Sequence, residues 1–148
     1  MTTKDNKSSS PILSRSEKET HDIATKFLKK LPKKKNYICL FGDLGSGKTV
    51  FTKGLAKGLG IENYSVKSPT YTLIREYIYP EGKLYHIDLY RLEAPDEVLF
   101  EQIAELANEE NSLIIIEWAD KLGDSLPENR TDICFEYVDP ETRKITIF

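Results

Sequence analysis

Residues 42–49 read Gly42-Asp43-Leu44-Gly45-Ser46-Gly47-Lys48-Thr49, which fits the phosphate-loop pattern G-x-x-x-x-G-K-[ST] at every fixed position. The apolar segment Tyr37–Phe41 before it predicts a buried strand, and apolar residues at helical spacing after it predict a helix that ends at Gly60. This is the strand–loop–helix order that such a loop requires. We expect its backbone N–H groups to converge on phosphate oxygens. Lys48 should reach the β- and γ-phosphates, and the Thr49 hydroxyl should ligate Mg²⁺.

The composition predicts a cytoplasmic globular protein without a membrane contact. The chain has 148 residues, of which 30% are charged and 39% are apolar, and this is enough for one domain with a core. Its net charge of -3 gives no argument for nucleic-acid binding. The longest apolar run, Leu113–Ile116, is too short to cross a bilayer, and the N-terminus lacks the apolar core of a signal peptide. Cys39 and Cys134 fall in strand-like runs, where we expect buried reduced thiols.

The N-terminal part of the chain predicts a polar tail and then an amphipathic helix. We expect residues 1–15 to form a disordered tail and residues 16–148 to form a single phosphate-loop domain. Ser16 begins a capping box for a helix over Glu17–Leu31. The basic run Lys29–Lys35 has two interpretations that the sequence leaves open. It is either a nucleic-acid-binding patch or a basic helix end followed by a solvated loop.

The remaining elements predict an α/β fold. Buried apolar strands that alternate with helices are typical of a three-layer P-loop NTPase fold. We expect a mostly parallel central sheet, helices on both faces, and antiparallel hairpins at the edges. The predicted elements after residue 60 are strands at Tyr71–Tyr79 and Lys83–Asp88, a helix that begins at Pro95-Asp96-Glu97, a buried strand at Leu113–Glu117, and strands at Asp132–Val138 and Lys144–Phe148.

Two acids qualify as the carboxylate that a phosphate loop needs to hold Mg²⁺ or polarise water. Glu117 ends the most apolar strand, and Asp88 ends another short apolar strand. Ligands of open α/β sheets bind at the carboxyl ends of strands, which favours both acids over solvent-facing residues. His86 shares a strand face with Asp88, and a core histidine bonded to its neighbours is favoured over a catalyst. Trp118 either packs near the nucleotide or fills the core.

The choice of nucleotide depends on two short motifs. Guanine-specific proteins carry N-K-x-D and D-x-x-G, each after a buried strand. Asn129–Asp132 and Asp120–Gly123 resemble these motifs, but they lie too close together for a strand and a helix to separate them. We therefore interpret both matches as coincidence and predict ATP as the nucleotide.

Four blocks of sequence together carry a resemblance to a known family. They are residues 42–49, Val66–Leu73 (Val-Lys-Ser-Pro-Thr-Tyr-Thr-Leu), Tyr85–Leu92 (Tyr-His-Ile-Asp-Leu-Tyr-Arg-Leu) and Ile116–Trp118 (Ile-Glu-Trp). From about Glu17 to Phe148 the chain resembles the small bacterial P-loop ATPase of the tRNA threonylcarbamoyladenosine modification machinery, the TsaE/YjeE family. Ser46 stands where that family commonly has alanine, and the loop tolerates this because it binds phosphate through its backbone.

The resemblance implies a protein that binds ATP and Mg²⁺, hydrolyses ATP slowly alone, and is stimulated by partner proteins. It implies two partners with actin-like folds, one of which transfers the threonylcarbamoyl group to the tRNA adenosine next to the anticodon. The ATP cycle would reset this complex between turnovers. Contact with tRNA is expected to be indirect, through the partners.

The same resemblance implies roles for individual residues. By the family pattern, Lys48, Asp88 and Glu117 are catalytic, with Asp88 near the γ-phosphate. Thr49 and Glu117 are the Mg²⁺ ligands. Without the resemblance, the division of roles between the two acids stays open. Two further features are a switch segment at Ser68-Pro69-Thr70 and a first helix near the adenine, around Glu17 and Thr20.

Two other functions remain to be separated from this one. A small-molecule P-loop kinase needs a lid with arginines and an acceptor pocket. The arginines here are scattered along the chain, and Arg91 is the only one suited to sensing a phosphate. A nucleotide-dependent scaffold that never hydrolyses ATP is the third hypothesis, and Asp88 and Glu117 argue against it.

Overall fold

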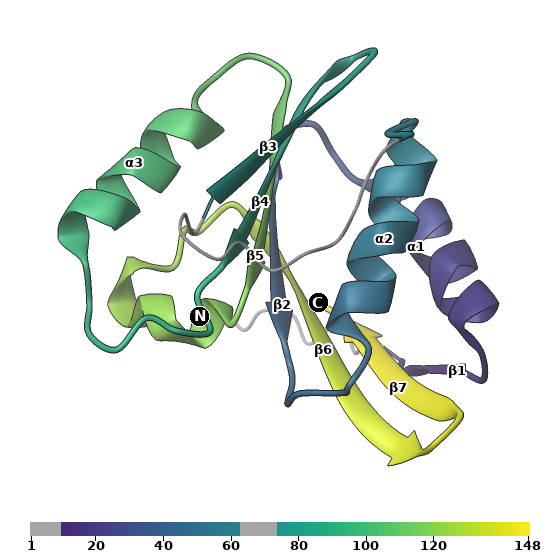
Figure 1. The fold of residues 1–148 in the computed structure, drawn as a ribbon. Helices are drawn as coiled ribbons and strands as arrows, with labels where there is room; N and C mark the ends of the chain where they lie inside the picture. Colours follow the sequence, from purple (N-terminus) through teal and green to yellow (C-terminus); the bar gives the residue numbers. More distant parts are fainter. Residues whose placement is uncertain (1–9, 63–73) are drawn as a thin grey trace, which may run out of the picture.

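A seven-stranded sheet with helices on both faces forms the frame of the molecule (Figure 1). The structure is a computed structural model, and it describes residues 10–62 and 74–148. The elements are β1 (Ile12–Ser14), α1 (Glu17–Lys30), β2 (Tyr37–Phe41), α2 (Lys48–Leu59), β3 (Ile74–Tyr79), β4 (Gly82–Asp88), α3 (Glu97–Ala107), β5 (Ser112–Glu117), the 3-10 helix η1 (Ala119–Ser125), β6 (Arg130–Asp139) and β7 (Thr142–Ile147).

The centre of the sheet is parallel, and its edges are antiparallel. β2 pairs in parallel with β5 on one side and β6 on the other, and β4 pairs in parallel with β5. β3 closes one edge on β4, and β7 and β1 close the other, which gives the order β1-β7-β6-β2-β5-β4-β3. The predicted fold class is confirmed. Because β2, β4 and β5 run in the same direction, the residues that follow them meet at one end of the sheet.

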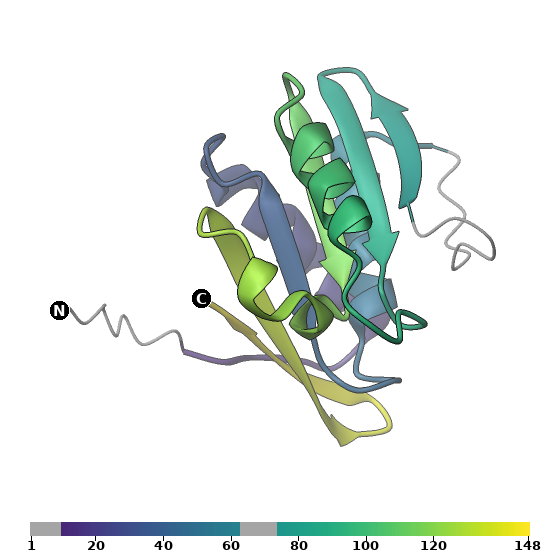
Figure 2. The same cartoon turned by 90° about the vertical axis from the view of Figure 1, so that its left-hand side faces the viewer.

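Two apolar layers explain why the central strands are apolar along their whole length. α1 and α2 cover one face, and α3 and η1 cover the other, as the two views in Figures 1 and 2 show. In β2, Ile38 and Leu40 belong to the cluster beneath α1 and α2, whereas Tyr37 and Cys39 belong to the cluster beneath α3. A strand buried on both faces needs apolar side chains at successive positions, not only at alternate ones.

Side-chain and glycine caps set the helix ends close to the predicted positions. The Ser16 hydroxyl accepts the backbone N–H of Glu19 at the start of α1, at 3.0 Å. The Glu19 carboxylate accepts the backbone N–H of Arg15, one residue before the position a standard capping box uses. α1 ends at Lys30, one residue earlier than predicted, and Gly60 ends α2 in a left-handed conformation.

The N-terminal boundary of the folded part requires a correction. Ile12–Ser14 form β1, which pairs antiparallel with β7. The prediction of a disordered tail over residues 1–15 is therefore wrong for this segment, and residues 1–9 lie outside the described residues. β1 pairs with the backbone of β7, which would otherwise be an unpaired sheet edge. A strand of three residues is too short to show a hydrophobic period, so the sequence does not reveal it. Ser14 of β1 is buried, and its hydroxyl oxygen lies 2.6 Å from the hydroxyl oxygen of Thr20 in α1.

Several other predictions can be compared with the structure directly. Cys39 and Cys134 are both free thiols as expected, but only Cys39 is buried, whereas Cys134 is half-buried. Burial raises the pKa of Cys39 to about 12. β3 begins at Ile74, and the predicted connection at 66–70 lies outside the described residues. Lysines 33–35 are exposed between α1 and β2, which fits both interpretations of the basic run. No helix in the described part of the chain is long and apolar enough to span a bilayer.

Candidate functional site

The predicted phosphate loop connects the C-terminal end of β2 to the N-terminus of α2 (Figure 1). Gly42, Gly45 and Gly47 take positive φ angles of 149°, 77° and 108°. Gly47 occupies the N-cap position of α2, where no side chain hydrogen-bonds to the first turn. The N–H groups of that turn therefore remain for an anion, which the helix dipole also favours.

Position 42 has room only for glycine, because the loop backbone passes close to the backbone of β6. A Cβ at this position would lie 2.6 Å from Ser46 Oγ and 2.7 Å from the backbone oxygen of Phe135 in β6. Real Cβ atoms do not approach other atoms this closely, and the Phe135 carbonyl belongs to the sheet. We expect Gly42→Ala to lower the stability of the fold and to abolish nucleotide binding, because the loop must move away from β6.

Gly45→Ala is the matched control for this prediction. Gly45 also has a positive φ, but a Cβ there meets nothing within 4 Å. Gly45→Ala should lower the free energy of unfolding by about 1–2 kcal/mol, which is the strain of a non-glycine residue in a left-handed conformation. Thermal unfolding of both variants, with and without nucleotide, measures the difference. Equal losses in the two variants would contradict the steric account.

Lys48 is the first residue of α2, and its ammonium group lies inside the curl of the loop. Nζ donates to the backbone oxygens of Gly42 and Asp43, the second at 3.2 Å, and lies 4.2 Å from the centre of the Trp118 ring. Burial lowers the pKa of this ammonium, whereas nearby carboxylates, led by Glu117, raise it. Loop carbonyls and an aromatic ring surround the cation. A phosphate group would replace weak partners with a strong one.

The two predicted acids lie side by side on neighbouring strands. Asp88 ends β4 and Glu117 ends β5, and the register pairs these residues directly. Glu117 is only 5% exposed, and its Oε2 lies 2.6 Å from Nε2 of His86. One oxygen of Asp88 accepts the backbone N–H of Tyr90 at 3.0 Å. The parallel pairing of β4 and β5 therefore presents two carboxylates to the phosphate loop.

A cavity of about 260 Å³ joins the loop to the acids. Its polar lining includes Lys48, Thr49, Asp88 and Glu117, so the structure brings together residues that the sequence places far apart. Trp118 lines the same cavity and also packs against the apolar cluster beneath α3, in a left-handed conformation with φ 59°. The full lining is Asp43, Leu44, Gly45, Ser46, Lys48, Thr49, Asp88, Tyr90, Arg91, Glu117 and Trp118.

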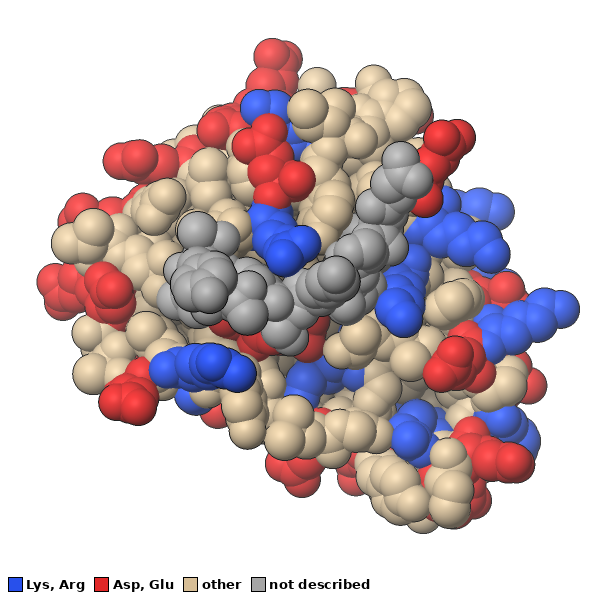
Figure 3. Space-filling view, viewed as in Figure 1, with Lys and Arg blue, Asp and Glu red and all other residues tan. Residues whose placement is uncertain are grey.

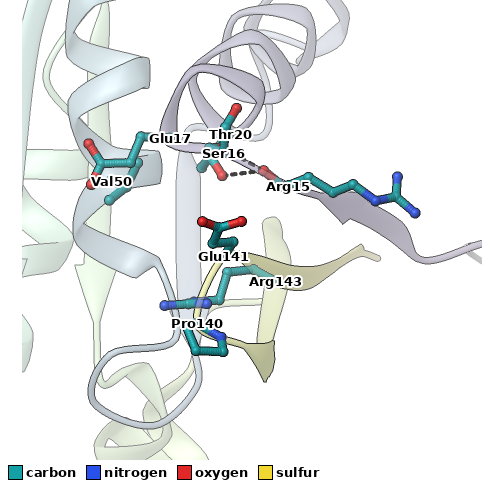
Figure 4. A pocket seen from close by; sticks show the side chains of 9 residues that line it. Arg15, Ser16, Glu17, Thr20, Val50, Pro140, Glu141 and Arg143 are labelled. Atoms are coloured by element: carbon teal, nitrogen blue, oxygen red, sulfur yellow. Dashed lines mark hydrogen bonds between the residues drawn. The ribbon is translucent and has the colours of Figure 1, made fainter.

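A second hollow, of about 360 Å³, lies on the other side of the loop between α1 and the β6–β7 turn (Figure 4). Glu17, Thr20 and Val50 line it together with Glu141 and Arg143. Figure 4 shows the Arg143 side chain extending across the hollow, while the Arg15 side chain points away from it. The family resemblance implies that Glu17 and Thr20 lie near the adenine, and both residues line this hollow.

Arg143 is a loop contact that sequence reasoning missed. Its Nε donates to the backbone oxygen of Gly45 at 3.1 Å, and its Nη1 donates to that of Asp139 at 2.7 Å. A lone arginine in a C-terminal strand carries no motif, so only the packing of the β6–β7 hairpin beside the loop reveals it. The predicted switch at Ser68-Pro69-Thr70 lies outside the described residues.

The sequence that forms the loop, the buried lysine and the paired acids matches a known protein family. The sequence model of the family described as "Threonylcarbamoyl adenosine biosynthesis protein TsaE" matches residues 14–145. The chain belongs to the TsaE family. The match extends from β1 to β7, so the TsaE family pattern includes the hairpin that carries Arg143 as well as the phosphate loop.

Individual TsaE relatives support the same conclusion. The TsaE protein of Aquifex aeolicus is 40% identical over 140 residues, which cover 93% of this chain and 94% of that protein. The TsaE protein of Haemophilus influenzae is 43% identical over 102 residues, which cover 69% of this chain and 63% of that protein. The crystal structure of YdiB from Bacillus subtilis superposes with a TM-score of 0.72 at 31% identity, over 93% of this chain and 83% of that one.

Proposed function

We propose that this protein is the ATP-binding and ATP-hydrolysing subunit of the machinery that makes N6-threonylcarbamoyladenosine in tRNA. The relatives named above are called tRNA threonylcarbamoyladenosine biosynthesis proteins, which supports the pathway. The observation that carries the proposal is the single cavity lined by Lys48, Thr49, Asp88 and Glu117 at the N-terminus of α2. A cation, a hydroxyl and two carboxylates in this arrangement suit a triphosphate and its metal ion.

The residues around the cavity fit Mg²⁺ that arrives with the nucleotide. The described part of the chain has no cluster of three or more His, Cys, Asp or Glu side chains that could hold a metal alone. Mg²⁺ is usually held by one or two carboxylates together with substrate phosphates and water. The Thr49 hydroxyl and the Glu117 carboxylate would hold it here, and the ion would neutralise charge that develops on the phosphates.

The remaining residues have separate tasks in this proposal. The loop N–H groups and Lys48 bind the β- and γ-phosphates, and the hollow beside Glu17 and Thr20 receives the adenosine. Asp88 accepts a hydrogen bond from the attacking water and orients it in line with the γ-phosphate. Lys48 is then the one cation of the described residues that lies buried at the phosphates. Hydrolysis by the isolated protein should therefore be slow.

Two partner proteins with actin-like folds would complete the system, and ATP turnover would reset them between rounds of transfer. Contact of this chain with tRNA would be indirect. On the face shown in Figure 3, acidic side chains crowd the margin over α3, and basic side chains gather on the opposite side with acidic ones among them. The part of this face over α3 is therefore unsuited to a nucleic acid. A nucleic-acid surface would be predominantly basic.

Steady-state turnover with and without the two partners tests the proposal. We expect slow hydrolysis alone and faster hydrolysis with both partners. Turnover that requires a small phosphoryl acceptor would instead identify a kinase. No hydrolysis under any condition would identify a nucleotide-dependent scaffold.

Base selectivity provides a separate prediction. Asp120–Gly123 and Asn129–Asp132 lie too close together to serve as the two guanine-reading motifs, so ATP should bind more tightly than GTP. A competition titration at equal concentrations measures this directly, and ADP against GDP serves as the control for phosphate number. Displacement of ATP by an equal concentration of GTP would overturn the prediction.

A further inference from the structure

His86 and Glu117 form a buried polar pair beneath the floor of the cavity. His86 Nε2 lies 2.6 Å from Glu117 Oε2, and the two side chains are only 2% and 6% exposed. The cavity itself is lined by Glu117 but not by His86. The imidazole therefore lies behind the carboxylate, where it contacts the acid and not the ligand.

The strand register explains how the pair forms. β4 and β5 are adjacent and parallel, and His86 is paired with Ile115, two residues before Glu117. Alternation along each strand puts His86, Ile115 and Glu117 on one face of the sheet. That face is the one beneath α2, because Ile115 and Leu84 belong to the cluster that includes Phe51 of α2. His86 is 1% exposed on this face, and the register places it between Arg75 of β3 and Ile115 of β5.

The pair divides the two oxygens of Glu117 between different partners. Because an ionised carboxylate can only accept, the contact requires a proton on Nε2 of His86, which then donates to Oε2, while Glu117 also lines the cavity. Oε1 is then the oxygen that a ligand in the cavity can use. A carboxylate fixed in this way loses less side-chain entropy when it binds a metal ion, and such supporting bonds commonly set metal affinity.

We propose that His86 is a positioning residue that orients the Glu117 carboxylate for Mg²⁺, with Oε2 held by the imidazole and Oε1 presented to the metal. This inference rests on the proposed function, because it requires Mg²⁺ to be bound with the nucleotide. His86 would orient the Glu117 carboxylate, a role distinct from phosphate binding by the loop and from metal binding by Glu117 itself.

The test compares nucleotide binding in Mg²⁺ and in EDTA by calorimetry, followed by a Mg²⁺ titration at saturating ATP. In His86→Leu the donor is lost while an apolar side chain fills the layer. We expect the Mg²⁺ concentration for half-saturation to rise about 10–100-fold. Affinity for ATP in EDTA should remain that of the parent, because the phosphate loop is unchanged.

Two further variants separate positioning from simple packing. In His86→Gln the amide N–H reaches about as far as Nε2 and should restore much of the Mg²⁺ affinity. Ile115→Val is the matched control, because it loosens the same layer beside His86 without removing a donor. It should lower the thermal unfolding temperature and leave the Mg²⁺ titration unchanged. If His86→Leu does not fold, His86→Asn, whose amide is too short to reach Oε2, should show the same weakened Mg²⁺ binding.

Three results would overturn the inference. A parental Mg²⁺ titration in a folded His86→Leu or His86→Asn variant would refute the positioning role alone. Equal weakening in Mg²⁺ and in EDTA would show that His86 only maintains the fold. A parent protein that binds ATP equally well with and without Mg²⁺ would refute the metal site of the proposed function, and the inference with it.

Discussion

Lys48→Ala should lower the affinity for Mg²⁺·ATP by roughly 100-fold or more. Each hydrogen bond to a charged group contributes about 1.5–3 kcal/mol, and the ammonium is placed to reach two phosphates. Its Nζ lies within reach of the Gly42 and Asp43 carbonyls, at the centre of the loop. Titration calorimetry with ATP measures the loss, and turnover should fall with it.

The control for Lys48→Ala is Lys53→Ala. Lys53 is exposed on the same helix and does not line the cavity, so this change removes an equal charge from α2 without touching the site. Thermal unfolding of both variants checks that the fold is retained, because Lys48 also lies among carboxylates. A Lys48→Ala protein that binds and hydrolyses ATP like the parent would show that residues 42–49 do not form a phosphate loop.

Asp88→Ala should abolish turnover while nucleotide binding stays close to that of the parent. The expected role of Asp88 is to orient the attacking water, and loss of a positioned acid or base typically lowers a rate by about 10²–10⁴-fold. Single-turnover hydrolysis, measured beside ATP affinity, separates the chemical step from binding. Asp88→Asn keeps the shape and an oxygen that can accept the Tyr90 N–H, so it distinguishes charge from loop structure.

Glu117→Gln is the matched counterpart, because Glu117 lies directly opposite Asp88 on β5. The amide oxygen can still accept from His86, but the negative charge offered to Mg²⁺ is lost. We expect weakened Mg²⁺-dependent binding rather than a pure loss of rate. The reverse pattern, with Asp88→Ala weakening metal-dependent binding and Glu117→Gln affecting only turnover, would mean that the two acids exchange roles.

Local signals account for most of the fold that the sequence predicts. β2 occupies Tyr37–Phe41 as predicted, and α1, α3 and β5 begin or end within a residue of their predicted positions because caps and apolar runs are local. β1 escapes prediction because it exists only by pairing with β7, across the whole length of the chain.

The candidate site likewise contains some residues that a local sequence signal marks and others that only the folded structure brings to the site. A motif marks Lys48 and Thr49, and the ends of apolar strands mark Asp88 and Glu117, so each has a signal in its own neighbourhood. Arg143 has none, since its contact with Gly45 depends on how the β6–β7 hairpin crosses the loop. The sequence likewise places His86 on the face of Asp88, but only the pairing of β4 with β5 makes Glu117 its partner.

We propose that this protein couples its nucleotide cycle to the two partner proteins. Calorimetry of this protein with the two actin-like-fold partners, in ATP, in ADP and without nucleotide, tests it most directly. We predict that ATP strengthens the association, by a factor within the usual range of about 5–150-fold, and that the partners strengthen ATP binding by the same factor. Equal association in all three states would contradict the claim, because the nucleotide would then supply no free energy to drive a cycle.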